Sequence, residues 1–266
     1  MLSIFQYGFI LRGLEAGLLV AIIAPLIGIF LVLRRYSLIA DTLSHVSFAG
    51  VALGVLLGIN PVWTAIGVAV VSSLGIERLR TSKRIFGESA LSLFLSGSLA
   101  IAIVLISYHR GISVNLSSYL FGSIVTVRQT DVWAVLIAGS IVALTVFALY
   151  KELVFISFDE EAAQVSGIPT KVINSILIVL AALTVALAIP IVGILLVSAL
   201  IVIPVLTALQ YHQSFKWTLL LAEIFSVLAV VLGILVSYYL NLATGGVIVL
   251  FSLLLFILSL LVNKQN

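Results

Sequence analysis

Long, continuous runs of apolar residues recur along the whole chain, and each could cross a bilayer as a helix of roughly 20 residues. The apolar residues do not alternate with polar ones, so the runs predict helices rather than strands. Nine candidate spans follow one another at 14–33, 37–58, 61–77, 88–107, 131–150, 171–189, 191–210, 217–240 and 244–262. The sequence therefore predicts an all-α polytopic membrane protein, with residues 1–266 forming one transmembrane domain.

The number of spans depends on two short interruptions. Pro190 and Gly193 separate the sixth run from the seventh, and residues 243–246 precede the ninth, so either place could be a bend or the end of a half-helix. We therefore expect eight or nine transmembrane helices. Charged residues make up only 9% of the chain, against about 25% in an average soluble domain. No stretch between the runs could form a soluble domain.

Basic residues at the ends of the runs predict the orientation of the chain. If Arg34 and Arg35 lie in the cytoplasm, so do ten of the thirteen Lys and Arg residues, and only Arg12, Arg110 and Arg128 lie outside. Because cytoplasmic loops of membrane proteins are enriched in Lys and Arg, we expect the N-terminus outside and the C-terminus inside.

Two ionisable residues, Asp41 and His45, stand one helical turn apart within the second apolar run. An ionisable group inside a membrane is costly unless it is paired, hydrated or bound, so such groups mark a pathway or a site. The i, i+4 spacing places both side chains on one helix face, where a carboxylate oxygen and an imidazole nitrogen can bind the same cation. This pair of ligands suits zinc, manganese or iron(II) better than an alkali ion.

Asp41 and His45 supply only two ligands, whereas zinc in proteins usually has four. Two copies of the chain facing each other across a two-fold axis would supply all four, and we therefore expect a homodimer. Other interpretations of the pair stay open. The two side chains could form a hydrogen bond in a polar bundle interior, or they could relay protons. An intramembrane hydrolase with zinc at these residues would be a different class of protein.

Gly50, Gly54 and Gly58 recur every four residues in the same run, on the side of the helix roughly opposite Asp41. Small residues at this spacing let another helix approach closely. The second span is therefore expected to pack tightly against a neighbouring helix on that side.

Three further residues are candidates for a pathway or a gate. Ser198 and Pro204 lie in the interrupted seventh run, and broken helices often line transport sites. Prolines in spans are also common as plain kinks. Glu223, toward the inner end of the eighth run, is an intramembrane acid that could lie on the pathway or near the interface.

Residues 151–170 form the longest connection on the side assigned to the cytoplasm. Ser157 followed by Glu160 fits a capping box, and acidic residues here favour a helix N-terminus. Gly167 suits a left-handed C-terminal position, and Pro169 prevents the helix from continuing. The sequence therefore predicts a helix of about two turns at 157–168. A helix this short must pack on something, either the neighbouring spans or a docked soluble protein.

Several function classes lack their sequence motifs. The chain has no cysteine, which excludes disulfides and thiolate metal sites. It also has no Gly-x-x-x-x-Gly-Lys-Ser/Thr phosphate loop and no His-Glu-x-x-His or Gly-x-Ser-x-Gly hydrolase motif. We therefore expect that the chain is not an enzyme and has no cofactor apart from an ion that it transports. The small net charge of +3 gives no reason to expect nucleic-acid binding.

Four motifs, in order along most of the chain, resemble those of the ABC-3 family, the membrane permeases of ABC importers for zinc, manganese and iron(II). They are Arg34-Arg35-x-Ser-Leu-Ile-x-Asp41-x-x-Ser44-His45-x-x-x-x-Gly50, Tyr119-Leu-Phe-Gly-Ser123, Phe158-Asp159-Glu-Glu-Ala-Ala163-x-x-Ser-Gly167-Ile-Pro169 and Val192-Gly193-x-Leu-Leu-Val-Ser198-Ala-Leu-x-x-x-Pro204. The resemblance implies a multi-pass protein of the bacterial cytoplasmic membrane, in which Asp41 and His45 bind the metal ion in transit.

The resemblance also implies partners. It predicts a homodimer, a separate cytoplasmic ABC ATPase subunit that hydrolyses ATP, and an extracytoplasmic metal-binding protein that delivers the ion. The helix at 157–168 resembles the coupling helix that docks on the ATPase in such permeases. A partner-binding role is therefore expected for six residues: Phe158, Asp159, Glu160, Ala163, Gly167 and Pro169.

The run His45-Val-Ser-Phe-Ala-Gly50 resembles the zinc branch of the family, since manganese permeases tend to have a proline just before that glycine. Zn²⁺ is therefore the expected ion, with Mn²⁺ or Fe²⁺ as alternatives and a partner-free, proton-coupled metal carrier as a further one. Residues 241–245 depart from the family pattern, because relatives often carry an acidic residue and a proline there. No metal role is expected for them.

Overall fold

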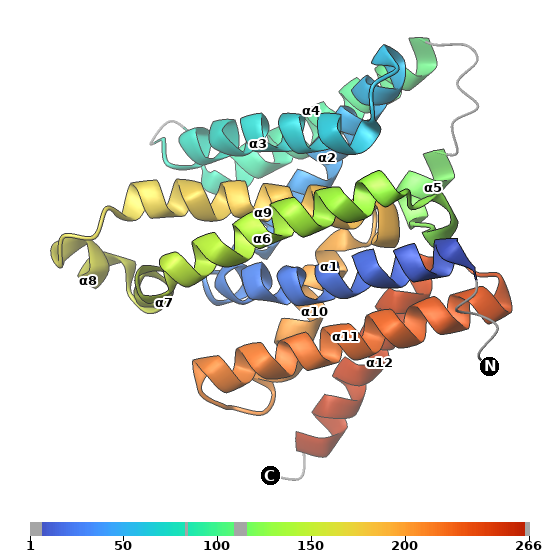
Figure 1. Cartoon of the computed structure of the whole chain (residues 1–266). Helices are drawn as coiled ribbons and strands as arrows, with labels where there is room; N and C mark the ends of the chain where they lie inside the picture. The colour runs from blue at the N-terminus through green and yellow to red at the C-terminus, as the bar shows by residue number, and fades with distance from the viewer. Residues whose placement is uncertain (1–6, 83–84, 109–115, 264–266) are drawn as a thin grey trace.

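The computed structural model describes residues 7–82, 85–108 and 116–263, and within these ranges the chain is helical and has no strand (Figure 1). The helices are α1 (Gly8–Leu33), α2 (Ser37–Leu57), α3 (Pro61–Arg80), α4 (Gly87–Tyr108), α5 (Leu116–Phe121), the 3₁₀ helix η2 (Ile124–Thr126), α6 (Gln129–Ala148), α7 (Tyr150–Phe158), α8 (Glu160–Val165), α9 (Thr170–Val192), α10 (Val197–Leu209), α11 (Phe215–Leu240) and α12 (Thr244–Asn263). The prediction of an all-α protein is confirmed.

Eight of the described helices are long and apolar enough to cross a membrane: α1, α2, α3, α4, α6, α9, α11 and α12. The candidate span at 191–210 is wrong, because α9 continues through Pro190 to Val192 and α10 has only 13 residues. At about 1.5 Å per residue, α10 is roughly 20 Å long, against about 30 Å for the hydrocarbon core of a bilayer. The described residues thus form eight spans, within the expected range of eight or nine, and α10 is a half-helix.

The segment that contains α5 forms hydrogen bonds with the non-helical backbone between α9 and α10. Gly193 ends α9 with a φ of +86°. Beyond it, the backbone N–H groups of Ile194 and Leu195 donate to the carbonyls of Tyr119 and Leu120, at 2.9 and 3.2 Å. Non-helical backbone is tolerated at membrane depth only where the protein satisfies its polar groups. Two of the four sequence motifs therefore hold each other in place.

The most buried helices are α1, α2 and α9, whereas α4 turns most of its surface outward. In α2, a Cβ added at Gly50 would overlap the backbone of Ala65 in α3, and one at Gly54 would overlap Thr64. The expected close approach of a second helix to this side of α2 is therefore confirmed. Gly58 has a different role, because it ends α2 with a φ of +67°.

The basic ends of the helices gather at one end of the bundle. Arg34, directly after α1, pairs with Glu160 in α8, and the guanidinium of Arg80 at the end of α3 lies over the ring of Tyr36, directly before α2. Figure 1 shows α8 at the left end of the bundle and the described start of α1 at the right. This arrangement agrees with the orientation predicted from Lys and Arg, in which the α8 end is cytoplasmic.

Candidate functional site

Asp41 and His45 lie one turn apart on α2, and both side chains are half-buried. Ser198, in the first turn of α10, donates its hydroxyl to Asp41 Oδ1 at 3.5 Å. This distance is long for an O–H···O bond, so the two oxygens are neighbours rather than a tight pair. The structure thus brings the acidic end of the sequence pair against the start of the half-helix, although the two residues are 157 positions apart.

The imidazole of His45 has an unused nitrogen. Its Nδ1 atom is buried and has no hydrogen-bond partner among the described residues. Among the described residues, no hydrogen bond joins His45 to Asp41. The two side chains therefore do not form the hydrogen-bonded pair that the sequence left open. A buried polar atom without a partner costs free energy, and a ligand at this atom would remove that cost.

The described residues contain no group of three or more His, Cys, Asp or Glu side chains that could hold a metal ion. Glu223 is half-buried on α11 and does not join Asp41 and His45 as a third ligand of this kind. Pro204 is buried within α10. Of the three candidates for a pathway or gate, Ser198 is the one with a hydrogen bond to the pair among the described residues.

The segment assigned to the cytoplasm contains two helices, α7 and α8, where the sequence predicted one at 157–168. Ser157 lies inside α7, where its hydroxyl donates to the carbonyl of Leu153, so the expected capping box with Glu160 is wrong. Asp159 caps α8 instead, because its Oδ1 accepts from the N–H of Ala162 at 2.8 Å. An Asp directly before a first turn can reach the free N–H groups there.

The end of this segment follows the expected chemistry. Gly167 has a φ of +87°, and its N–H donates to the carbonyl of Gln164 at 3.1 Å. The N–H of Ile168 donates to the carbonyl of Ala163, also at 3.1 Å, which together makes a Schellman motif. Pro169 then precedes α9 as its N-cap.

The six residues expected to bind a partner differ in exposure. Ala163 is fully buried and Glu160 is half-buried, so these two attach α8 to the bundle. The other four are exposed: Phe158, Asp159, Gly167 and Pro169. The apolar side chains of Phe158 and Val165 are 69% and 89% exposed, so most of each is free to contact another molecule.

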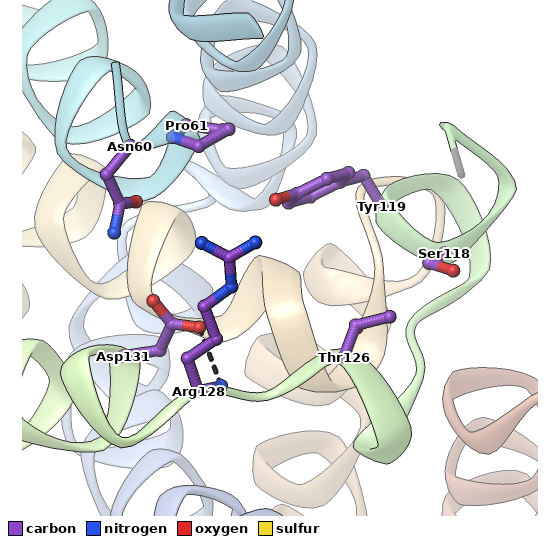
Figure 2. A pocket seen from close by; sticks show the side chains of 7 residues that line it. All are labelled: Asn60, Pro61, Ser118, Tyr119, Thr126, Arg128 and Asp131. Carbon is purple, nitrogen blue, oxygen red and sulfur yellow. Dashed lines mark hydrogen bonds between the residues drawn. The ribbon is translucent and has the colours of Figure 1, made fainter. Parts of the chain in front are cut away.

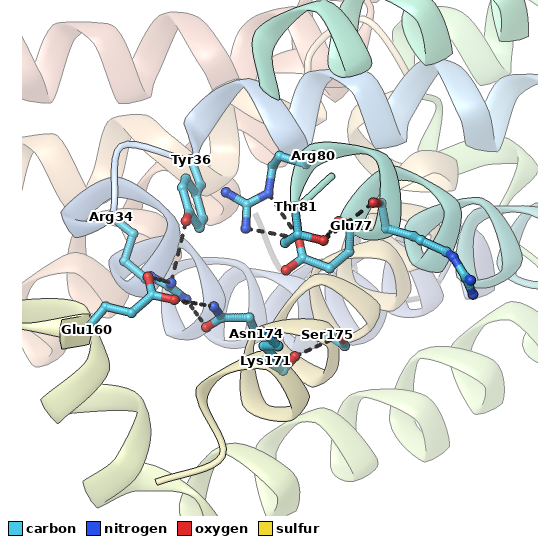
Figure 3. Close-up of polar contacts among 10 residues, drawn as sticks. Arg34, Tyr36, Glu77, Arg80, Thr81, Glu160, Lys171, Asn174 and Ser175 are labelled. Atoms are coloured by element: carbon cyan, nitrogen blue, oxygen red, sulfur yellow. Dashed lines mark hydrogen bonds and ion pairs between the residues drawn. The ribbon is translucent and has the colours of Figure 1, made fainter. Parts of the chain in front are cut away.

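A polar clasp of three residues, Glu160, Arg34 and Asn174, holds α8 against the bundle (Figure 3). Glu160 Oε2 pairs with Arg34 Nη2 at 2.7 Å, and Glu160 Oε1 accepts from Asn174 Nδ2 at 2.7 Å. Arg34 Nη1 closes the triangle by donating to Asn174 Oδ1, again at 2.7 Å. The clasp therefore joins α8 to the end of α1 and the first turns of α9.

Tyr36 extends the clasp toward the metal-binding candidates. Its ring lies between two guanidiniums, with the Arg34 Cζ atom 4.7 Å and the Arg80 Cζ atom 4.1 Å from the ring centroid. Tyr36 is the N-cap of α2, so it stands five positions before Asp41. Contacts thus run without interruption from α8 to the beginning of the helix that carries Asp41 and His45.

A polar cavity of about 180 Å³ lies at the opposite end, and sequence reasoning missed it. Figure 2 shows the guanidinium of Arg128, the carboxylate of Asp131, the phenol of Tyr119 and the amide of Asn60 around one space. Asp131 is buried, and its Oδ2 accepts from the N–H of Arg128 at 3.0 Å. Burial raises the pKa of the Tyr119 phenol, and the negative charge of Asp131 raises that pKa further.

The sequence contains few signs of the contacts of Arg34, Asn174 and Asp131, which sequence reasoning did not predict. Arg34 was used to predict orientation, and its partner Glu160 is 126 residues away. The one sign in the sequence is Asn174, a polar residue near the start of a span, where a buried amide would need a partner. In the structure Asn174 is 4% exposed. Asp131 stands in the first turn of α6, where an acidic residue is unremarkable.

Eight apolar helices define a multi-pass membrane protein, and the short helix α10 brings Ser198 against the ionisable pair on α2. The model of the ABC 3 transport family matches residues 6–263, and the chain therefore belongs to this family. The resemblance found in the four sequence motifs is confirmed. Members of the family are transport permeases, not enzymes.

Similar proteins support the assignment. A Treponema pallidum protein named "Probable metal transport system membrane protein" is 40% identical over 254 residues, covering 95% of each chain. The manganese transport system membrane protein MntC of Listeria innocua is 32% identical over 259 residues, covering 97% of this chain and 92% of the relative. The structure of PsaBC from Streptococcus pneumoniae in complex with Fab superposes with a TM-score of 0.87 at 31% identity, covering 97% and 95% of the two chains.

Proposed function

We propose that this chain is the membrane permease of an ABC importer for a divalent transition-metal ion, and that Asp41 and His45 bind the ion in transit. Family membership supports the metal permease, and the resemblance of the motif around Asp41 and His45 to that of the family supports the site residues. One observation carries it: Ser198, at the start of the half-helix, lies against Asp41, one turn from a His45 nitrogen that has no partner among the described residues. Ionisable groups beside a broken helix are typical of transport sites.

A two-fold pair of chains would complete the site. One chain offers the carboxylate of Asp41 and the imidazole of His45, and no third His, Cys, Asp or Glu joins them among the described residues. Two chains related by a two-fold axis would offer two of each.

Two of the three expected ions, Zn²⁺ and Mn²⁺, have specific support, and Fe²⁺ stays an alternative. The residues around His45 favour Zn²⁺, since the run ending at Gly50 resembles the zinc branch of the family. The names of relatives such as MntC favour Mn²⁺. The contact of Ser198 with Asp41 places a hydroxyl oxygen beside the two carboxylate oxygens, and oxygen-rich sites suit Mn²⁺.

The segment around α8 is the proposed docking site for a cytoplasmic ATPase subunit. The exposed side chains of Phe158 and Val165 offer apolar contact area, while Ala163 and Glu160 anchor the helix to the bundle. The ion would be delivered on the other side of the membrane by an extracytoplasmic metal-binding protein. The cavity around Arg128 and Asp131 lies at that end.

Radiometal uptake by the assembled transporter tests the proposal and separates the two ions. Cells lacking their own importers would express the chain with its ATPase and binding protein, and uptake of radioactive Zn²⁺ and Mn²⁺ would be compared. We expect Asp41→Asn and His45→Gln to reduce uptake of the transported ion to background. Glu15→Gln is the matched control, since Glu15 is another acid within a span but lies exposed on α1.

Two outcomes would contradict the proposal. Full uptake by the Asp41→Asn variant at normal membrane levels would remove Asp41 from the site. Uptake that persists after deletion of every ATPase partner would favour a partner-free, proton-coupled carrier instead.

A further inference from the structure

A second cavity, of about 460 Å³, lies at the α8 end of the bundle, between the end of α3 and the start of α9. Glu77, Arg78 and Thr81 line it from the α3 side, and Lys171 and Ser175 line it from α9. Figure 3 shows Glu77, Thr81, Lys171 and Ser175 around this space. None of these residues belongs to the proposed metal site or to α8.

Arg78 and Lys171 give this cavity an excess of positive charge. Both side chains are exposed, and neither forms an ion pair with a described residue. The one carboxylate in the cavity wall, Glu77, is already paired, because Nε and Nη2 of Arg80 both lie 2.9 Å from Glu77 Oε2. An anionic group between Arg78 and Lys171 would balance the remaining charge through charge-assisted hydrogen bonds.

Glu77 also has an unused acceptor. The residue is 5% exposed, and its Oε1 atom has no hydrogen-bond partner in the described part of the chain. The nearby hydroxyls do not supply one, since Thr81 donates to the carbonyl of Glu77 and Ser175 donates to the carbonyl of Lys171. A buried carboxylate oxygen without a donor is costly, so the wall favours a ligand that brings a hydroxyl beside its anionic group.

The position of the cavity points to a membrane lipid as the source of that ligand. Val71, Leu74 and Arg78 follow one another at i, i+3 and i+7 on α3, so they share one face of the helix. Val71 is 72% exposed and Leu74 is 50% exposed, and Leu74 lines the cavity. The cavity therefore joins an apolar outer surface of α3 to a basic end of the bundle, and basic pockets between spans on the cytoplasmic side bind anionic headgroups.

We propose that this cavity binds the headgroup of an anionic glycerophospholipid with free hydroxyls, of the phosphatidylglycerol type. The phosphate lies between Arg78 and Lys171, the headgroup hydroxyls donate toward Glu77 Oε1, and an acyl chain follows Val71 and Leu74. The inference rests on the cavity and its charges, and it holds whatever ion the protein transports.

Native mass spectrometry of the purified full-length chain in detergent tests the proposal. Phosphatidylglycerol, phosphatidylcholine, phosphatidylmethanol and inorganic phosphate would each be titrated. The double variant R78Q/K171Q removes both cavity cations, and K151Q/K216Q is the matched control, because Lys151 and Lys216 are exposed basic residues outside the cavity. We expect the cavity variant to lose phosphatidylglycerol affinity by roughly tenfold or more, and the control to keep it.

Comparing the lipids tests the contact with Glu77 separately from the binding of the lipid as a whole. Phosphatidylmethanol keeps the negative charge and lacks the hydroxyls, so we expect it to bind more weakly than phosphatidylglycerol. Equal affinity of the two lipids would overturn the contact with Glu77. Equal loss in both double variants, phosphatidylcholine binding as tight as phosphatidylglycerol binding, or saturation of the cavity by inorganic phosphate alone would overturn the lipid site.

Discussion

Glu160 in α8 pairs with Arg34 after α1 across 2.7 Å, and the side chain of Arg34 is only 4% exposed whereas that of Glu160 is 42% exposed. A nearly buried guanidinium thus depends on an acid that reaches it from the proposed docking helix. Loss of one partner of a buried ion pair is more damaging than loss of both, because a charge remains without compensation. Any movement of α8 must therefore move Arg34 or break this pair.

The substitution Glu160→Ala tests this dependence. We expect it to lower the free energy of unfolding by about 1–2 kcal/mol, less than the roughly 3–5 kcal/mol of a fully buried pair, because Glu160 is partly exposed to solvent. In the assembled transporter we also expect fewer ions imported per ATP hydrolysed. Thermal unfolding of the purified permease and paired uptake and ATPase assays in liposomes measure the two effects.

Glu161→Ala is the control for that experiment, since Glu161 lies next to Glu160 on α8 but is exposed. It should leave both the unfolding temperature and the ratio of transport to ATP hydrolysis unchanged. If Glu160→Ala behaves like Glu161→Ala in the transport assay, the clasp anchors α8 without transmitting its movement.

Gly193→Ala tests the break between α9 and α10. The φ of Gly193 is +86°, and an added Cβ would overlap the backbone of Gly122 and Leu120. Because backbone cannot move aside as a side-chain tip can, we expect a loss of stability of about 2 kcal/mol or more and poor accumulation in the membrane. Gly97→Ala in α4 is the control, since nothing lies within 4 Å of its added Cβ. Equal membrane levels of the two variants would contradict the close contact.

The sequence predicted most spans because a membrane helix depends on one local property, a run of about 20 apolar residues. It failed at 191–210 because the ends of α9 and α10 depend on distant backbone. Pro190 was expected to interrupt the helix, yet α9 continues past it to Val192. The helix ends only where Gly193 turns and the carbonyls of Tyr119 and Leu120 accept the next N–H groups. No window around residue 193 contains those partners.

In the candidate site too, the features within one helix were predictable and the contacts between helices were not. The i, i+4 spacing of Asp41 and His45 lies within one helix and can be recognised from the sequence. The approach of Ser198 to Asp41 depends on how α10 packs against α2, which the spacing does not contain. The helix at 157–168 was predicted in the right region, but Asp159 replaced Ser157 as its cap because the backbone turns at Asp159, with a φ of −152°. The zinc expectation and the partner contacts of α8 stay predictions.

Ser198→Ala should weaken the metal site without destroying it. The hydroxyl lies 3.5 Å from Asp41 Oδ1, so its removal takes one weak donor from the carboxylate and leaves Asp41 and His45 in place. We expect the apparent KM for the ion to change by roughly three- to tenfold while transport continues. Thr207→Val is the control, because the Thr207 hydroxyl donates to the carbonyl of Ile203 within α10. An unchanged KM in Ser198→Ala would place Ser198 outside the site.

The number of ions bound per chain distinguishes a shared site from two separate ones. If two chains face each other and join their Asp41 and His45 side chains around one ion, the purified permease should bind one ion per two chains. Such a site loses two of its four ligands when one chain of the pair carries Asp41→Asn and His45→Gln. A mixed dimer of one intact and one doubly substituted chain should therefore bind no ion at the concentration that saturates the intact dimer. Equilibrium dialysis with elemental analysis, on dimers purified through two different affinity tags, measures this ratio.

One ion per chain in the intact dimer, or half of the intact binding in the mixed dimer, would show that each chain holds its own ion. In that case water or backbone carbonyls would have to supply the remaining ligands, since no third His, Cys, Asp or Glu joins the pair among the residues described.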